Sequence, residues 1–192
     1  PSAKYTNPQF KVNSTELMKL IKTPLDMLDS DKKQDKVLLG TWCFKNDANV
    51  LYDRQVFNIV PYHWDDREKY NKDYVYLSGL YEKLLAQWAK ALNNLHNTDR
   101  DLRYWRIIIG PWLRFFVDSV FDRFEQIRSV KIGGNIPVSN IYCYDVKDWI
   151  PYDFAEFYDR LTSDGWNEVL FSECLKSLNM PHVPSKRKLM PS

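Results

Sequence analysis

Short apolar runs that stop at glycine or proline, followed by a long amphipathic segment, constrain the fold of this chain more than any other feature. Residues 36–40, KVLLG, have the length and composition of a buried strand that leads into a loop. Residues 56–60, VFNIV, form a second such run, and Pro61 ends it because proline lacks the N–H that a central strand donates. Apolar side chains at spacings of three and four then predict a helix over residues 68–94.

The second half of the chain continues this alternation. Three successive isoleucines before the Gly110–Pro111 pair favour a strand at residues 104–109 and a helix at 111–129, although a kinked, all-helical segment fits the same residues. A further strand and two more helices are predicted at residues 141–144, 151–162 and 166–179. Strands that alternate with helices predict an α/β fold, with a Rossmann-like, mostly parallel sheet and flanking helices.

The length of 192 residues suits one hydrophobic core. We expect a polar lead-in over residues 1–35, a single α/β domain over residues 36–180 and a flexible polar tail over residues 181–192. The chain begins with Pro1 rather than Met and closes on a proline-punctuated tail, so we expect a piece of a longer protein. Surfaces exposed in such a piece are candidates for contact with a missing neighbour.

The charge balance and the cysteines exclude several classes of function. The 27 Lys and Arg residues against 25 Asp and Glu leave a net charge of +2, too small for a surface that binds nucleic acid through its backbone. Cys43, Cys143 and Cys174 match no zinc motif, so we predict no metal site and reduced thiols in a cytoplasmic protein. No apolar run approaches the roughly 20 residues of a membrane span, which leaves only peripheral contact with the cytoplasmic membrane face. Aromatic residues make up 15% of the chain, so some rings are available for a binding surface.

The tract PYHWDDR, between the second predicted strand and the long helix, is the main candidate site, because ligands bind at the carboxyl ends of strands in open α/β sheets. His63, Asp65 and Asp66 are the candidate catalytic residues, since imidazole and carboxylate can take a proton from a hydroxyl group. Trp64 and Arg67 are candidates for substrate binding, the arginine through a bidentate contact with phosphate or carboxylate. A structural alternative stays open: one aspartate caps the helix, the arginine pairs with a neighbour and the tryptophan packs against the first turns.

Two more places carry candidate substrate-binding residues. Trp42 follows the first predicted strand, next to Cys43, which we expect to be a small buried packing residue rather than a nucleophile. Arg103, Trp105 and Arg106 precede the isoleucine run and can clamp a sugar phosphate, or equally lie half-buried in ion pairs. The chain contains neither GxGxxG nor GxxxxGKS/T, so the common nucleotide-binding loops are absent.

Four sequence segments at these places resemble a family of transferases encoded among O-antigen and other surface-polysaccharide genes. The segments are LLGTWC at 38–43, YHWDDREKYNKDYVYL at 62–77, LRYWRIIIGPWL at 102–113 and, more weakly, DGWNEVLFSECL at 164–175. The resemblance spans residues 36–175. Thr41 stands where the family pattern carries an acidic residue, so no carboxylate role is transferred to that position.

The resemblance implies the N-terminal, acceptor-side lobe of a two-lobed enzyme related to the GT-B glycosyltransferases. It implies a saccharide or sugar-phosphate acceptor, no cofactor in this lobe, and a nucleotide-sugar donor on a missing C-terminal lobe. Two other functions stay open: a noncatalytic glycan- or partner-binding assembly module, and a lobe of a polyol-phosphate transferase.

Overall fold

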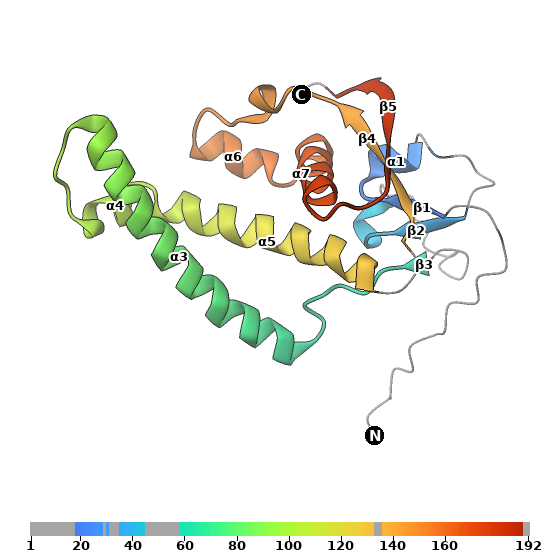
Figure 1. Cartoon of the computed structure of the whole chain (residues 1–192), viewed down its shortest axis with the longest axis horizontal. Coiled ribbons are helices and arrows are strands. Elements are labelled where there is room, and N and C mark those ends of the chain that lie inside the picture. The colour runs from blue at the N-terminus through green and yellow to red at the C-terminus, as the bar shows by residue number, and fades with distance from the viewer. Residues whose placement is uncertain (1–17, 29, 31–34, 45–57, 133–135, 190–192) are drawn as a thin grey trace.

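The computed structural model describes residues 18–28, 30, 35–44, 58–132 and 136–189. Within them a parallel sheet lies at one end of a bundle of helices (Figure 1). The strands are β1 (Lys19–Ile21), β2 (Lys36–Leu38), β3 (Asn58–Ile59), β4 (Val138–Cys143) and β5 (His182–Lys188). The helices are α1 (Pro24–Leu28), α3 (Arg67–His96), α4 (Leu102–Ile108), α5 (Gly110–Ile132), α6 (Phe154–Arg160), α7 (Asp164–Ser177) and the 3-10 helices η1 (Thr41–Cys43) and η2 (Val146–Trp149). None of these helices is long and apolar enough to cross a membrane.

The five strands pair in the order β3-β2-β1-β4-β5, and every pair is parallel. The predicted α/β fold, a mostly parallel sheet with flanking helices, is therefore confirmed. From β1 the chain adds β2 and β3 on one side and β4 and β5 on the other, so the winding reverses between β1 and β4. In an open α/β sheet, ligands usually bind outside the carboxyl ends of the strands at such a reversal.

Most predicted elements lie where the sequence pattern placed them. β2 and β4 overlap the strands predicted at 36–40 and 141–144, and α3 covers the whole of the predicted helix 68–94. β3 confirms the second strand at Asn58–Ile59, while residues 56–57 lie outside the described part of the chain. α6 and α7 confirm the last two predicted helices, although α7 begins at Asp164, two residues before the predicted start.

The predicted domain limits at residues 36 and 180 need correction, because the sheet extends beyond both of them. β1 is the central strand, and all three of its residues are buried, although they fall in the predicted lead-in. Three residues are too few to give a periodic signal, and the short helix α1 follows at once, with Pro24 at its first position. β5 falls in the predicted tail; as an edge strand it can be polar and can contain Pro184.

The strand predicted at residues 104–109 is wrong, and the all-helical alternative is correct. α4 occupies Leu102–Ile108, and the Asp101 carboxylate caps it by accepting the Tyr104 N–H at 2.7 Å. Such a cap stabilises a helix by about 1 kcal/mol, which outweighs the few tenths that each isoleucine costs. The chain then turns at Gly110, where a Cβ would lie 2.7 Å from the Tyr81 hydroxyl, so glycine permits α3 to lie close by.

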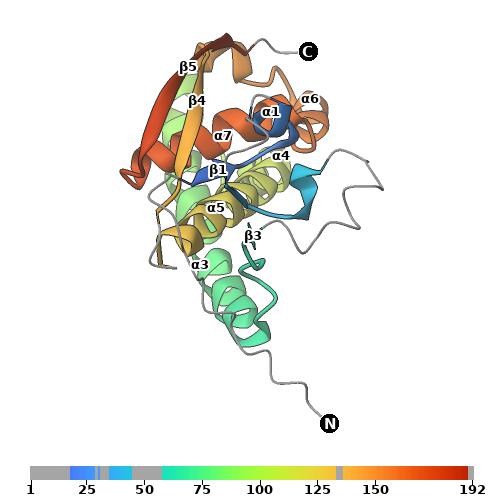
Figure 2. The same cartoon turned by 90° about the vertical axis from the view of Figure 1, so that its right-hand side faces the viewer.

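Separate apolar clusters stabilise the two ends of the molecule. Leu20 and Leu38 of the sheet pack with Ile127 of α5 and Leu175 of α7, and α5 and α7 lie side by side against the sheet (Figure 1, Figure 2). A second cluster joins α3 to the first half of α5 through the side chains Leu77, Leu85, Leu113 and Val117. We call α3, α4 and the first half of α5 the helical arm, since they extend away from the sheet (Figure 1).

Candidate functional site

A cavity of about 550 Å³ opens at the carboxyl ends of β1, β2 and β3. We call it the edge cavity. The residues after the three strands contribute one part of its lining, and helices α5 and α7 with the short segment between α6 and α7 contribute the other. The lining side chains that matter for chemistry are Thr23, Trp42, Tyr62, Asp122, Arg123 and Asn167. Its place at the carboxyl edge of a parallel sheet is the expected place for a ligand.

Trp42 presents a fixed aromatic surface to this cavity. It lies in η1 directly after β2, and its indole Nε1 donates to the Lys22 carbonyl oxygen at 3.0 Å. A Cβ on Gly40 would lie 2.1 Å from the ring, so glycine lets the indole lie against the turn. The side chain is 40% exposed. The expectation for Cys43 is confirmed: it is buried, and burial raises the pKa of its thiol to about 12.

Asp122 of α5 is a carboxylate in the lining that accepts three side-chain hydrogen bonds. Its carboxylate accepts hydrogen bonds from the Tyr62 hydroxyl at 2.7 Å, His63 Nε2 at 2.9 Å and Arg123 Nη1 at 2.5 Å. Burial by itself raises the pKa of this carboxyl, but hydrogen bonds from His63 and Tyr62 and the Arg123 charge outweigh it, so the pKa lies below its usual value. The group is therefore an ionised acceptor, 13% exposed.

Arg123 stands next to this carboxylate and bridges two helices. Its Nε donates to Asn167 Oδ1 on α7 at 3.1 Å, and its Nη1 contacts Asp122. A guanidinium group carries five N–H donors, and these two contacts use two of them. Arg123 therefore keeps donors for a charged or polar ligand in the edge cavity.

A buried ionic cluster lies beneath the edge cavity, just after β1 and beside β4. The Lys22 ammonium contacts Asp26 and Glu168, each at 2.8 Å, and Ser139 Oγ at 2.8 Å. Thr23, which lines the cavity, donates to Glu168 at 2.8 Å. Burial raises the pKa of Glu168 to about 7, against the attraction of the lysine. The cluster ties β1, α1, β4 and α7 together and fixes the floor of the cavity.

The residues of the predicted tract PYHWDDR do not all lie at one site in the structure. His63 is buried, with a side chain 2% exposed, and reaches the cavity lining through its hydrogen bond to Asp122. Asp66 is the N-cap of α3, because its Oδ1 accepts the N–H groups of Glu68 and Lys69 at 2.9 and 3.2 Å. This confirms the capping alternative for Asp66. A catalytic role for His63 stays a prediction.

The other three residues of the tract lie around the start of α3. Trp64 donates from Nε1 to Asp73 at 3.0 Å and stacks on Phe121, so it packs between α3 and α5 as the alternative expected. Asp65 is exposed, and the exposed Arg67 guanidinium lies 5.7 Å from the centre of the Tyr70 ring. These three side chains do not contribute to the lining of the edge cavity.

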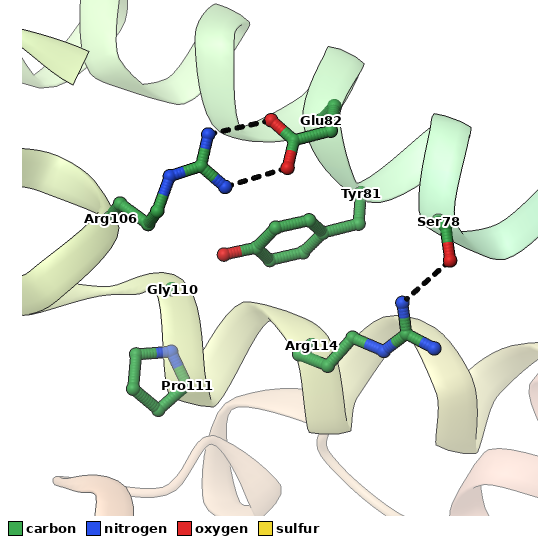
Figure 3. A pocket seen from close by; sticks show the side chains of 7 residues that line it. All are labelled: Ser78, Tyr81, Glu82, Arg106, Gly110, Pro111 and Arg114. Carbon is green, nitrogen blue, oxygen red and sulfur yellow. Dashed lines mark hydrogen bonds and ion pairs between the residues drawn. The ribbon is translucent and has the colours of Figure 1, made fainter. Parts of the chain in front are cut away.

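The predicted group Arg103, Trp105 and Arg106 lies in the helical arm, at the other end of α5 from the sheet (Figure 1). Figure 3 shows Arg106 in a pocket of about 440 Å³, where its two terminal nitrogens donate to Glu82 at 2.6 and 2.7 Å. Trp105 is buried, and Arg103 is exposed. The half-buried, ion-paired alternative therefore describes Arg106 better than a clamp on a ligand.

Sequence reasoning missed Asp122, Arg123 and Asn167, which lie within amphipathic helices and have the pattern of a solvent-facing side. It also missed Lys22, because the predicted domain began at residue 36. An available signal was the isolated Glu168 among apolar residues of α7, since a buried carboxylate needs a cationic partner.

Comparison with known proteins gives the class of the chain. No curated protein and no solved structure matches it. The model of a family described as LIC12162 family transferase matches residues 18–191. This range contains every described strand and helix, so the match covers the sheet, the edge cavity and the helical arm together. The chain therefore belongs to the LIC12162 family of transferases.

Proposed function

We propose that this chain is the acceptor-side, N-terminal lobe of a glycosyltransferase-like enzyme in bacterial surface polysaccharide or O-antigen biosynthesis. The observation that carries the proposal is the edge cavity, which combines an exposed indole with a carboxylate, an amide and a guanidinium group. Aromatic rings stack on the C–H faces of sugars, and the polar groups pair with hydroxyls and phosphates. Membership of a transferase family and the parallel sheet support the same assignment.

Each cavity residue has a distinct part in this proposal. Trp42 forms the platform on which a sugar ring of the acceptor stacks, and Asp122 accepts a hydrogen bond from an acceptor hydroxyl. His63 is the member of the predicted catalytic group that we retain, as a positioning residue that orients Asp122. Arg123 holds a phosphate or another charged part of the acceptor. The nucleotide-sugar donor binds to a C-terminal lobe. The N-terminal lobe, which this chain forms, needs no cofactor.

The proposal is tested by comparing two carboxylates that each pair with an arginine, one in the edge cavity and one in the arm. Asp122→Asn removes the ionised acceptor from the edge cavity, whereas Glu82→Gln removes the carboxylate that pairs with Arg106 in the arm. Both variants are placed in the full-length protein, and surface polysaccharide is measured in cells that lack the wild-type gene. We expect Asp122→Asn to reduce polymer by about tenfold or more and Glu82→Gln to leave it unchanged. Normal polymer in the Asp122 variant would sink the assignment.

A second candidate, a noncatalytic assembly module, is favoured by exposed rings on α3. Tyr74, Tyr76 and Trp88 are all exposed on the helical arm, away from the edge cavity. Tyrosine and tryptophan are typical anchors of protein interfaces. Under this function, changes at these rings abolish polymer formation by releasing a partner, while changes at the edge cavity do not.

A further inference from the structure

His63 lies close to two further carboxylates besides that of Asp122. A ring nitrogen of His63, a carboxylate oxygen of Asp73 on α3 and one of Glu125 on α5 all lie within 4.8 Å of one another. His63 and Glu125 are buried, and Asp73 is half-buried. The loop after β3 and the helices α3 and α5 thus converge on one point.

The hydrogen bonding of the His63 ring leaves one nitrogen available. Nε2 contacts the Asp122 carboxylate at 2.9 Å, and a carboxylate accepts hydrogen bonds, so Nε2 is the donor and Nδ1 is the nitrogen that can offer a lone pair to a cation. Nδ1 is buried and has no hydrogen-bond partner among the described residues. A histidine that donates one ring N–H to a carboxylate while its other nitrogen stays free has the arrangement found in metal-ligating histidines.

The two carboxylates already hold a cation. The Lys69 ammonium donates to Asp73 and lies 3.0 Å from Glu125. Its side chain is 29% exposed, so it can move into solvent without crossing the core. Asp73 and Glu125 also line a groove of about 520 Å³ between α3 and α5, which gives an ion a path to them. Trp64 and Arg128 hydrogen-bond the same carboxylates and orient them.

We propose that His63 Nδ1, Asp73 and Glu125 form a binding site for a divalent transition-metal cation of the Zn²⁺ type, which replaces the Lys69 ammonium. One imidazole and two carboxylates suit a borderline cation with an open fourth position, whereas Mg²⁺ and Ca²⁺ prefer oxygen ligands alone. Tetrahedral coordination at about 2.1 Å sets ligand atoms about 3.4 Å apart, so the three groups close inward by about 1 Å. The bound ion then fixes the loop after β3 to α5 and holds His63 against Asp122.

Calorimetric titration of the 192-residue chain with Zn²⁺ tests the site. Cys143 is exposed, and its thiol competes for zinc, so Cys143→Ser serves as the parent protein. We expect one saturable equivalent of zinc, bound about 100-fold more weakly by Asp73→Asn and by Glu125→Gln. Lys69→Met binds more tightly than the parent because it removes the competing ammonium. Glu82→Gln, which breaks an ion pair in the arm, binds like the parent.

Titration with Co²⁺ provides a second readout that does not depend on the stability of any variant. Coordination by three protein groups and one water gives an intense visible absorption band, and Zn²⁺ removes it. The proposal is overturned by the absence of saturable binding to the Cys143→Ser parent, or by binding that neither carboxylate variant weakens. Metal binding that is lost in His182→Gln rather than in the carboxylate variants would place the metal at another site, and this result also overturns the proposal.

Discussion

The edge cavity and the pocket of the helical arm contain the same kinds of side chain: an arginine, a carboxylate and an aromatic ring. In the arm, Arg106 gives both terminal nitrogens to Glu82, and its guanidinium lies 5.8 Å from the centre of the Tyr81 ring (Figure 3). In the edge cavity, Arg123 divides its contacts between Asp122 and a neutral amide. Each arginine gives two N–H groups, but Arg106 gives both to one carboxylate in a bidentate pair, whereas Arg123 shares its contacts between a carboxylate and an amide that both line the edge cavity.

The two regions also differ in what lies beneath them. The arm pocket rests on an apolar cluster, in which Leu77 and Leu113 hold α3 against α5. The edge cavity rests on the buried ions Lys22, Asp26 and Glu168 at the reversal of the sheet. These ions are fully buried and paired with one another, and they join β1, α1, β4 and α7 at the floor of the cavity. The two regions contain the same residue types, but they differ in their place in the fold. The edge cavity lies at the carboxyl ends of the strands, and the arm pocket lies between helices.

The largest expected effect is the loss of the cation beneath the edge cavity. Lys22→Met leaves Asp26 and Glu168 buried without their partner, and breaking a buried pair from one side costs about 3–5 kcal/mol. Urea denaturation measures the free energy of unfolding. As a matched control, Lys72→Met removes an exposed lysine from the arm and changes stability by less than about 0.5 kcal/mol. Equal losses of stability from Lys22→Met and Lys72→Met would show that the buried ions beneath the edge cavity stabilise the fold no more than an exposed lysine of the arm does.

The next effect is a pH dependence confined to the same cluster. Glu168 faces Lys22, Asp26, Thr23 and Ser172, and burial raises its pKa to about 7, compared with about 4.3 for an unfolded chain. Between these values the folded state holds the proton more tightly, so stability falls as the pH rises, by at most about 1.4 kcal/mol per unit. Above about pH 7 the contribution is lost and the dependence levels off.

Glu168→Gln isolates this dependence from that of other groups. Urea denaturation between about pH 5 and 7 gives the slope for the wild type and for the variant, and the difference between the slopes belongs to Glu168. We expect the variant to have a distinctly flatter profile over this range. Identical slopes would show that groups other than Glu168 cause the pH dependence.

A smaller loss of stability is expected at the start of α3, where Asp66 caps the helix. Asp66→Ala removes the N-cap of α3, which costs about 1 kcal/mol of stability. Because Asp66 caps a helix in this account, polymer formation persists once the variant is folded. Asp66→Asn is the control, since asparagine caps nearly as well and restores stability. Loss of polymer formation in a stable Asp66→Asn protein would contradict this expectation and support a catalytic role for Asp66.

The sequence predicted those parts of the fold that have long or strongly periodic patterns. The spacing of Leu77, Leu84 and Leu85 predicted α3, and the run before Gly40 predicted β2. β1 was missed because three residues carry no period, and its role depends on pairing with β2 and β4. The isoleucines of α4 favoured a strand because propensity is weaker than a helix cap and tertiary packing.

For the candidate site, sequence reasoning placed the region but few of its side chains. Trp42 was predicted and lines the edge cavity, since a loop after a strand is a reliable place for a ligand contact. Asp122 and Arg123 could not be predicted, because on a helix their pattern is that of a solvated face. Only the packing of α5 against the sheet brings them to the strand ends.

Two tryptophans of nearly equal exposure provide the most direct test of the account. Trp42 in the edge cavity is 40% exposed, and Trp88 on the helical arm is 42% exposed. Each is replaced by alanine in the full-length protein, and surface polysaccharide is measured in cells that lack the wild-type gene. We expect Trp42→Ala to lower polymer by about tenfold or more and Trp88→Ala to keep the wild-type level. Normal polymer in Trp42→Ala together with a loss in Trp88→Ala would contradict it and assign the function to the arm.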